Sequence, residues 1–530
     1  MKKIIPMILV FAACVNHMAA QVNFTNENIS TVGSSRAIVD MNGDDLDDVV
    51  SVTSSNVNVH YQLEAGGFNT VNIPTSAADN TASWSMAAAD YDGNGFTDLL
   101  YGGGSGVTFM RANNTGTGFT EISGPEYVFS QRSNFVDINN DGHLDAFVCH
   151  DVAPNVYYIN DGSGNLEFIQ GGLGDYPSGG NYGSVWIDYD NDGDMDMFIA
   201  KCGGETARRT NQMLTNNGDG TFTENAAELG LDDPMQTWSS AWGDFDNDGD
   251  MDVFVGASTG SHKLMVNNGD NTFSDVTAGS GVEFGSTGIE NTKYDFDNDG
   301  NLDLISNGAL LFGNGDMTFD APIFGEINNG SFGDLNSDGF VDGFDNGTIS
   351  WNDGNANNWL TITTRGTVSN LNGIGAKLEI VTPTGVQIRE VRIGEGFRNS
   401  STLNTHFGIG ADTEISQLTI KWPSGIVDVY DDVNINEIIV SVEGETVLGV
   451  NDNEVNDLIL YPNPTTERIN LSVAAGFDNA VYMIYDVTGR KVLNGKLEGR
   501  SIDVSKLSTG NYVLRFINNG SVRIQKFVKN

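Results

Sequence analysis

The chain has 530 residues and carries 26 Lys and Arg against 71 Asp and Glu, a formal net charge of −45. This charge argues against nucleic acid or an anionic membrane surface as a partner, because both would repel it. With 39% hydrophobic residues, 65 Gly and 11 Pro, the composition excludes an acidic disordered chain. It favours several domains of strands joined by tight turns.

The first 20 residues are typical of an export signal. Lys2 and Lys3 precede the apolar stretch 4–13, and a small-residue cleavage site follows at 18–20. The apolar stretch is too short to span about 30 Å of hydrocarbon. Cys14 leaves lipoprotein processing open as an alternative. Cys149 and Cys202 could form a disulfide or remain buried thiols, and the sequence leaves both open.

An acidic repeat, D-x-[DN]-x-[DN]-G-x-x-D, dominates the first two thirds of the chain. Its seven copies begin at Asp40, Asp90, Asp137, Asp188, Asp244, Asp295 and Asp334. The first copy has Asp45 in place of the glycine at position 6. We number the positions 1 to 9 and the loops 1 to 7.

Each loop has the ligand spacing of a calcium site. Positions 1, 3, 5 and 9 supply side-chain oxygens, position 7 offers its carbonyl, and the glycine lets the backbone wrap an ion. The loops hold 28 carboxylates and no Lys or Arg, so they should repel one another unless cations lie among them. Oxygen ligands without His or Cys favour Ca²⁺ over Zn²⁺ or copper.

The sequence therefore predicts up to seven calcium sites with 28 ligand residues. They are Asp40, Asn42, Asp44 and Asp48; Asp90, Asp92, Asn94 and Asp98; Asp137, Asn139, Asp141 and Asp145; Asp188, Asp190, Asp192 and Asp196; Asp244, Asp246, Asp248 and Asp252; Asp295, Asp297, Asp299 and Asp303; and Asp334, Asn336, Asp338 and Asp342.

These loops are not EF-hands, because position 12 lacks the bidentate Glu, and only Asp345 is acidic there. The flanks are β-branched and aromatic, as in strands. Each period of about 50 residues has the content of a four-stranded propeller blade. Residues 22–352 resemble the FG-GAP/VCBS repeat family, the integrin-α-like β-propellers, and seven loops imply seven blades. Residues 22–28 echo 221–225 and are predicted to supply the outer strand of the last blade.

After Trp351 the acidic loops end and alternating strands follow. Four groups of residues form a second pattern: Asn358–Leu360, Asn370 with 373–376, His406–Gly410 and Lys421–Gly425. This stretch resembles the ASPIC/UnbV domain, and the resemblance implies no catalytic residue. His406 is predicted to be a structural histidine rather than a ligand.

The C-terminal stretch from residue 456 has ten basic and six acidic residues, unlike the rest of the chain. It contains Leu460–Pro464, Ile484–Arg490, Ile502–Tyr512 and a terminal Lys-Phe-Val-Lys. This pattern resembles the C-terminal sorting domain of type IX secretion (the Por system), a small Ig-like β-sandwich. The resemblance implies export through the outer membrane, followed by release or surface attachment.

The sequence thus predicts an all-β chain. The expected divisions are a signal peptide (1–20), a seven-bladed propeller (21–352), an ASPIC/UnbV domain (353–445), a linker (446–456) and a sorting domain (457–530).

A search for catalytic residues finds one weak candidate. Residues 256–260 match G-x-S-x-G with His262 nearby, but a nucleophile elbow needs a helix after the serine and strand residues follow. No catalytic residue is predicted.

The expected function is a secreted, calcium-binding adhesion or ligand-binding protein. Its expected partners are the type IX secretion machinery and an extracellular protein or glycan, with no nucleic acid and no transmembrane segment in the mature chain. The alternative is a calcium-dependent propeller lyase or hydrolase of extracellular polysaccharide, because a catalytic carboxylate pair could not be recognised among so many acids.

Overall fold

The computed structural model describes residues 22–285, 287–394, 396–445, 459–461, 463–472, 481–486, 491–497, 501–518 and 521–530. The expected signal peptide and Cys14 lie outside these residues. The chain divides into two compact units, Met1–Gly449 and Val450–Asn530. No helix in the described ranges is long and apolar enough to cross a bilayer.

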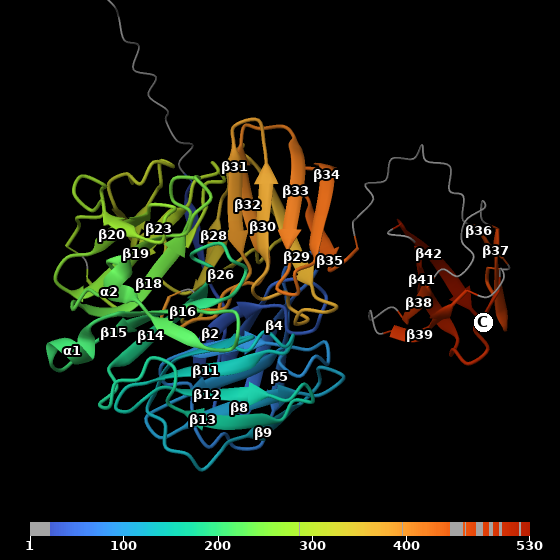
Figure 1. Ribbon diagram of the computed structural model, residues 1–530, viewed down its shortest axis with the longest axis horizontal. Coiled ribbons are helices and arrows are strands. Elements are labelled where there is room, and N and C mark those ends of the chain that lie inside the picture. The colour runs from blue at the N-terminus through green and yellow to red at the C-terminus, as the bar shows by residue number, and fades with distance from the viewer. Residues whose placement is uncertain are drawn as a thin grey trace, which may run out of the picture. The chain divides into compact units, whose positions relative to one another are not determined.

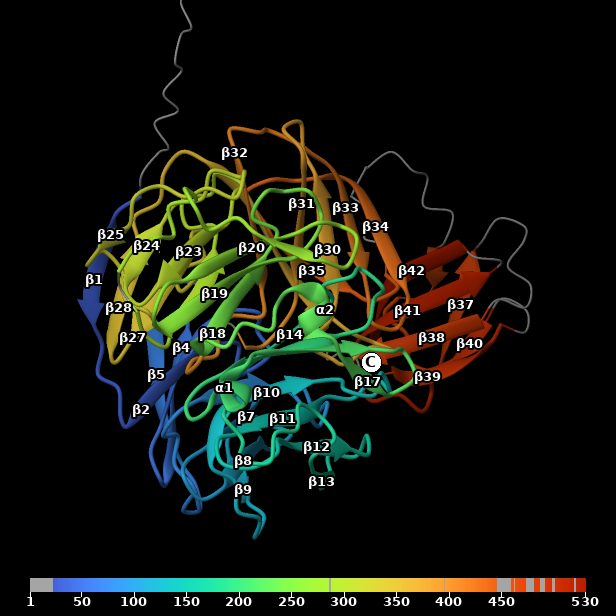
Figure 2. The same ribbon diagram turned by 60° about the vertical axis from the view of Figure 1, so that its left-hand side comes forward.

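Seven four-stranded antiparallel sheets make up residues 22–352 (Figures 1 and 2). Sheets 1 to 3 are β2 (Ser34–Val39), β3 (Asp48–Val52), β4 (Asn56–Gln62) and β5 (Phe68–Pro74); β6 (Met86–Ala89), β7 (Asp98–Gly102), β8 (Val107–Ala112) and β9 (Phe119–Ile122); and β10 (Ser130–Val136), β11 (Asp145–His150), β12 (Val156–Asn160) and β13 (Leu166–Gln170). Sheets 4 and 5 are β14 (Asn181–Ile187), β15 (Asp196–Lys201), β16 (Gln212–Asn216) and β17 (Phe222–Glu224); and β18 (Gln236–Gly243), β19 (Asp252–Thr259), β20 (Lys263–Asn267) and β21 (Phe273–Asp275). Sheets 6 and 7 are β22 (Asn291–Tyr294), β23 (Asp303–Ser306), β24 (Ala309–Leu311) and β25 (Ile323–Phe324); and β26 (Ser331–Gly333), β27 (Asp342–Asp345), β28 (Thr348–Asn352) and β1 (Phe24–Asn28). Two short helices, α1 (Thr206–Arg209) and α2 (Ala226–Leu229), belong to the connections of sheet 4 and to the link from sheet 4 to sheet 5.

The sheets stand around a central channel as a propeller, as predicted. The innermost strands contact one another in the order β2, β6, β10, β14, β18 and β22, and β26 contacts β2. Sheets 6 and 7 share a cluster that includes Phe296, Ile305 and Phe332. In sheet 3, β11 is buried along its whole length, whereas β13 is partly exposed. The hydrophobic core therefore lies between the inner halves of neighbouring sheets.

The ring is closed by the N-terminal strand, as the sequence predicts. β1 pairs antiparallel with β28, from Phe24 opposite Asn352 to Asn28 opposite Thr348. Thr25 Oγ1 also donates to Asp353 Oδ1 at 2.9 Å. Both ends of the propeller sequence thus lie in sheet 7.

A second β-domain, which we call the cap domain (residues 358–445), follows the ring. Its sheets are β32 (Thr405–Gly410), β29 (Asn358–Arg365) and β35 (Ile438–Val442); and β31 (Val386–Glu390), β30 (Lys377–Val381), β33 (Ile415–Lys421) and β34 (Val427–Val433). Leu378, Phe407 and Leu418 of this domain belong to one hydrophobic cluster with Phe109 and Phe135 of sheets 2 and 3. The cap domain and the ring therefore share a core within one compact unit.

Residues 396–402 of the cap domain, which we call the plug segment, lie in the central channel. Met86 N donates to Arg398 O at 3.0 Å, and Ile38 N donates to Ser400 O at 3.0 Å. In sheet 7, which neighbours sheet 1, Thr402 N donates to Phe332 O at 2.9 Å. The plug segment thus pairs with innermost strands of sheets 1, 2 and 7.

The C-terminal unit consists of two small sheets around one core. They are β36 (Ile459–Tyr461), β37 (Arg468–Ser472) and β40 (Ser501–Asp503); and β39 (Lys491–Lys496), β38 (Val481–Asp486), β41 (Gly510–Asn518) and β42 (Ser521–Lys529). Ile469 and Ile502 of the first sheet and Leu514 and Phe527 of the second are buried in the same cluster. This arrangement matches the predicted β-sandwich.

Candidate metal sites

All seven acidic loops connect the innermost strand of a sheet to its second strand, so they lie at the same end of the ring. In each loop the position-1 carboxylate accepts the backbone N–H groups of positions 5 and 6. In loop 3, for example, Asp137 Oδ1 accepts from Asp141 N at 3.0 Å and Oδ2 from Gly142 N at 2.8 Å. The loop is therefore curled around its first aspartate.

The position-9 aspartate links its loop to the third strand of the same sheet. In loop 1, Asp48 Oδ2 accepts from Met41 N at 3.0 Å and Oδ1 from Gln62 N at 2.8 Å. The equivalent carboxylates of loops 2 to 7 accept the same two kinds of backbone N–H. Position 9 thus has a structural role in addition to its predicted role as a ligand.

Position 3 divides the loops into two classes. Loops 1, 3 and 7 have Asn there, and its side chain bonds to position 5: Asn139 Nδ2 donates to Asp141 Oδ2 at 3.1 Å, and Asn139 Oδ1 accepts from Asp141 N at 3.1 Å. Asn42 and Asn336 make the same pair of bonds. In these loops the place between positions 3 and 5 is filled by hydrogen bonds.

Loops 2, 4, 5 and 6 have Asp at position 3, and these four side chains share an unusual feature. Each has one buried oxygen without a hydrogen-bond partner: Asp92 Oδ1, Asp190 Oδ1, Asp246 Oδ1 and Asp297 Oδ2. An isolated buried carboxylate oxygen is costly unless it is paired or bound to a metal. These residues therefore fit a cation.

The same four loops bring three carboxylates together, with ligand oxygens within 4.8 Å of one another. The groups are Asp90, Asp92 and Asp98; Asp188, Asp190 and Asp196; Asp244, Asp246 and Asp248; and Asp295, Asp297 and Asp299. In loops 2 and 4 the third carboxylate of the group is the position-9 aspartate. In loops 5 and 6 it is the position-5 aspartate. Among the described residues, the Asn-type loops form no such group.

Burial raises the pKa of the loop carboxyls. It raises the pKa of Asp48 to about 8, of Asp145 to about 7 and of Asp196 to about 9 at position 9. At position 1, burial raises the pKa of Asp137 to about 6 and of Asp188 to about 7. Burial therefore disfavours the charged form of these carboxyls, and a positive charge beside them would oppose this effect.

Position 4 has a role that the sequence analysis did not identify. Its residue has a positive φ in every loop, and Asn140, Asn191 and Asn247 adopt 57°, 64° and 58°. Their amides reach position 7 of the next loop: Asn140 Nδ2 donates to Asp194 Oδ1 at 2.6 Å, and Asn191 Nδ2 to Asp250 Oδ1 at 2.6 Å. The recurrence of Asn or Gly at position 4 was the sequence signal that could have indicated this role.

The cap domain contacts the loops, which the sequence alone did not indicate. Arg365 Nη2 donates to Asp45 Oδ1 at 2.7 Å in loop 1, Asn372 Oδ1 accepts from Asp90 N at 2.9 Å in loop 2, and His406 Nε2 lies 2.6 Å from Asn298 Oδ1 in loop 6. His406 is structural, as predicted, and burial lowers its pKa to about 3.

Arg389 of the cap domain supplies a buried positive charge to loops 5 and 6. Its side chain is buried, with the guanidinium 5.3 Å from the centroid of the Phe407 ring. Burial raises the pKa of Asp244 to about 6, and the Arg389 charge opposes this rise. Burial also raises the pKa of Asp295, and the Arg389 charge opposes this rise as well. The two loops are thus partly neutralised by the protein itself.

The G-x-S-x-G string has no catalytic geometry. Ser258 lies in β19, and its hydroxyl donates to the Gln236 carbonyl at 3.0 Å. His262 Nδ1 accepts from Ala257 N at 3.0 Å, and its ring packs against Phe254. Each side chain thus has its own structural partner. Cys149 and Cys202 are buried free thiols, which excludes the disulfide between them.

The fold and the loops define a β-propeller built from acidic repeats, and several of their aspartate clusters could hold a metal ion. An FG-GAP-like repeat model matches residues 40–101, 90–148, 137–199, 188–255 and 244–306, about half of the chain. The chain therefore belongs to the FG-GAP-like repeat family. It also matches the ASPIC and UnbV domain over residues 366–447 and the secretion system C-terminal sorting domain over residues 459–530. The sorting domain indicates secretion or attachment at the outer-membrane surface.

Curated relatives cover only part of the chain. Cartilage acidic protein 1 of Homo sapiens is 29% identical over 251 residues, which is 41% of this chain and 37% of that protein. The Xenopus tropicalis protein of the same name is 28% identical over 41% of this chain and 38% of its own length. The chain therefore spans less than two fifths of these relatives.

Two solved structures illustrate the structural similarity, which is weak in both. A crystal structure of BBS1N in complex with ARL6DN shares 10% identity, with a TM-score of 0.41 over 62% of this chain and 95% of that chain. The V. cholerae biofilm matrix protein Bap1 shares 10% identity, with a TM-score of 0.32 over 96% of this chain and 84% of that chain. Similarity at this level does not bear on function.

Proposed function

We propose that the chain is a calcium-binding adhesion or ligand-binding propeller that works outside the cell. The observation that carries this proposal is the set of four aspartates at position 3, each of which has a buried, unpartnered oxygen and belongs to a group of three carboxylates with ligand oxygens within 4.8 Å of one another. The sorting domain supports the location. Outside the cell, calcium reaches millimolar levels, which fill even sites with a Kd of about 10⁻⁴–10⁻³ M.

Calcium suits these loops better than other cations. Every ligand position holds Asp or Asn, which supply the oxygen ligands that Ca²⁺ prefers. The 28 predicted residues at positions 1, 3, 5 and 9 would hold the ions, and a bound ion supplies the positive charge that the buried carboxylates need. We expect tighter binding in loops 2, 4, 5 and 6 than in loops 1, 3 and 7, where Asn and position 5 already bond to each other.

The ions would stabilise the propeller and would not take part in a reaction. Each loop joins the first, second and third strands of its sheet through positions 1 and 9, so an ion there would stabilise the whole sheet. We propose that the chain is not an enzyme, which agrees with the structural partners of Ser258 and His262. Release of new reducing ends or unsaturated sugars from a polysaccharide by the purified protein would contradict this.

Metal analysis and thermal unfolding test the proposal together. The purified chain should contain several equivalents of calcium by elemental analysis. Its melting temperature should fall in EDTA and recover on addition of Ca²⁺, because each site filled at 100 times its Kd adds about 2.7 kcal/mol of stability. A metal-free protein that melts at the same temperature with and without EDTA would overturn the proposal.

A further inference from the structure

One position of the repeat gathers side chains at the channel end opposite the acidic loops. It lies six residues before each position-1 aspartate, within three residues of the start of the innermost strand. Its occupants in sheets 1 to 7 are Ser34, Trp84, Gln131, Tyr182, Trp238, Ile289 and Asn328. A strand of this length places them roughly 20 Å from the loops. Sheets 2 to 5, which are consecutive, thus place two tryptophans, a tyrosine and a glutamine at this end of the channel.

The three aromatic side chains form a cluster over the plug segment. The ring centroids of Trp84 and Trp238 are 6.1 Å apart, and those of Tyr182 and Trp238 are 4.5 Å apart. Phe397 of the plug segment lies beneath them, 5.1 Å from Trp238 and 6.3 Å from Trp84. Phe397 is buried, whereas the other three rings are half-buried. The three half-buried rings therefore expose aromatic surface to solvent, and the buried Phe397 supports them from below.

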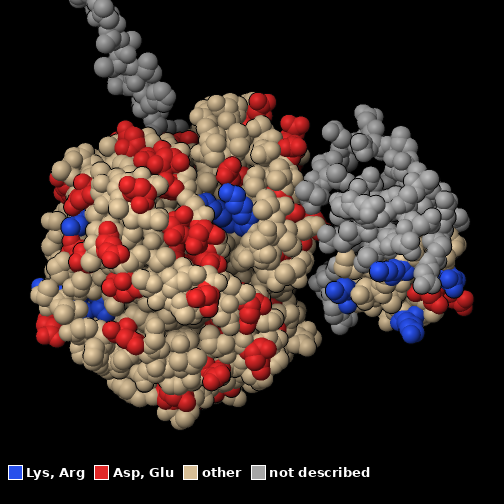
Figure 3. All heavy atoms as spheres, viewed as in Figure 1, with Lys and Arg blue, Asp and Glu red and all other residues tan. Residues whose placement is uncertain are grey.

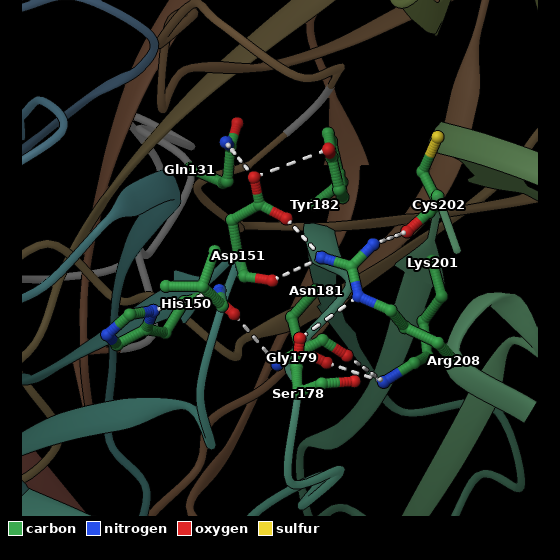
Figure 4. A network of polar contacts seen from close by, with 12 residues as sticks. Gln131, His150, Asp151, Ser178, Gly179, Asn181, Tyr182, Lys201, Cys202 and Arg208 are labelled. Atoms are coloured by element: carbon green, nitrogen blue, oxygen red, sulfur yellow. Dashed lines mark hydrogen bonds and ion pairs between the residues drawn. The ribbon is translucent and has the colours of Figure 1, made fainter. Parts of the chain in front are cut away.

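Polar groups beside the cluster have unused hydrogen-bonding capacity (Figure 4). Asp151 Oδ2 receives only long bonds, from Gln131 Nε2 at 3.5 Å and from the Tyr182 hydroxyl at 3.4 Å. Gln131 is 1% exposed, and its Oε1 has no partner. A buried amide oxygen without a donor is costly. Asp151 Oδ2, on a side chain that is 13% exposed, is therefore suited to a hydroxyl group of a ligand, and the buried Gln131 lies behind it.

Arg208 fixes the carboxylate of this group. Its Nη2 donates to Asp151 Oδ1 at 2.7 Å and to Asp151 O at 2.6 Å, and its Nη1 donates to Cys202 O at 2.8 Å. The ion pair is about 85% buried on both sides. Asp151 is therefore held in place before any ligand arrives, which lowers the entropy cost of binding.

We propose that Trp84, Gln131, Asp151, Tyr182 and Trp238 form a binding site for a neutral carbohydrate, an inference that rests on the proposed ligand-binding function. The apolar face of a sugar ring would stack on the indoles, and its hydroxyls would donate to Asp151 Oδ2, which Gln131 helps to position. A neutral sugar is favoured over an anionic one because the chain carries a net charge of −45. On the larger of the two units in Figure 3, acidic side chains are scattered widely and basic ones are few.

Binding of named polysaccharides tests this site. The probes are laminarin, galactomannan, mannan and dextran, with polygalacturonate as the anionic comparison, measured by affinity electrophoresis and by tryptophan fluorescence on the calcium-loaded full chain. We expect at least one neutral probe to bind and to quench fluorescence. Trp84→Ala should weaken that binding about tenfold, the equivalent of one lost ring contact. Gln131→Leu should weaken it severalfold.

Two further variants separate binding from folding. Trp351→Ala removes a half-buried tryptophan of sheet 7, stacked on Phe68 at 6.3 Å, and should leave binding unchanged. Trp238→Phe keeps an aromatic ring and should retain most of the affinity. Melting temperatures of all variants identify any that fail to fold.

The outcomes distinguish this site from the proposed function. If no neutral probe binds, or if Trp84→Ala binds as well as the wild type while folded, the carbohydrate site is wrong. If polygalacturonate or a protein ligand binds instead, the carbohydrate site is wrong and the ligand-binding function stands. If neutral probes bind to a protein without metal and without an EDTA effect, the calcium proposal fails and the carbohydrate site stands.

Discussion

Asn140 in loop 3 donates its side-chain amide to Asp194 Oδ1 in loop 4 at 2.6 Å. The bond crosses from one sheet of the propeller to the next. Asn140 can make it because its backbone adopts φ 57°, a conformation that asparagine tolerates better than most residues. Asn191 and Asn247 extend the same connection to loops 5 and 6. The acidic loops therefore form a linked chain around much of the ring.

The first prediction separates the two contributions of Asn140. Asn140→Gly removes the hydrogen bond but keeps the left-handed backbone, and should lower the free energy of unfolding by about 1 kcal/mol. Asn140→Ala also strains the backbone and should cost about 1–2 kcal/mol more. Urea unfolding in saturating calcium measures both. Equal stability of the two variants would show that the backbone conformation contributes nothing.

A second prediction concerns charge at position 3. In EDTA, Asp190→Asn should raise the free energy of unfolding by about 1 kcal/mol, the scale of one unit of pKa shift, because it removes one of three clustered carboxylates. In calcium, the same variant should be less stable than the wild type, because a charged ligand is lost. Melting temperatures with and without EDTA check both signs.

The matched control for this prediction is Asn139→Asp in loop 3. It creates an Asp-type loop, so it should lower stability in EDTA and increase the response to calcium. If Asp190→Asn is destabilising in EDTA as well as in calcium, repulsion among the loop carboxylates is not the dominant effect.

The third prediction is that the propeller does not fold stably without the plug segment. Glu290 accepts from Phe397 N at 2.8 Å and Arg398 N at 2.9 Å, and Arg132 Nη1 donates to Asn399 O at 2.6 Å. A fragment ending at residue 352 leaves both buried charges without these partners. We expect it to aggregate or to be digested rapidly by protease, because these hydrogen bonds are lost and the apolar core that sheets 2 and 3 share with the cap domain becomes exposed.

Removal of the second compact unit provides the control. A fragment of residues 22–449 retains the plug segment and should melt with the ring transition of the full chain. If the fragment ending at 352 is as stable as this one, the cap domain is an independent module after all.

A fourth prediction concerns pH and Glu443. This buried carboxylate accepts from Thr367 N and Val368 N at 2.6 Å each and from Ser369 N at 2.8 Å. Burial alone would raise its pKa, but hydrogen bonds, led by that from Ser424, hold the pKa below its usual range. Its stabilisation is therefore complete above the unfolded pKa of about 4.3 and is lost as pH falls through the lower folded value.

Glu443→Gln should lower the free energy of unfolding by about 3 kcal/mol at pH 7, because an amide cannot accept all of these bonds. The difference from the wild type should shrink as the pH falls below 4. Urea unfolding across this range tests the prediction, with the exposed Glu414→Gln as the control. A difference that does not change with pH would assign the loss to packing instead of charge.

The sequence by itself was sufficient for the repeats, the acidic loops, the closing strand β1 and the three families along the chain. These features depend on residues close together in the chain, such as Asp188 and Asp196, or on segments that repeat one another, such as residues 22–28 and 221–225. Local spacing encodes them directly. The predicted boundary after residue 352 and the binding of calcium ions by the loops stay predictions.

Only the tertiary structure decided how the ring is filled and linked. Arg132 and Asn399, or Asp45 and Arg365, are separated by more than 260 residues, and no periodicity in the sequence relates them. The two classes of loop are visible in the sequence as Asn or Asp at position 3, but only the structure shows that the Asn bonds to position 5 and that the Asp keeps an oxygen without a partner. Such choices follow from packing and from the burial of charge, which are properties of the folded chain as a whole.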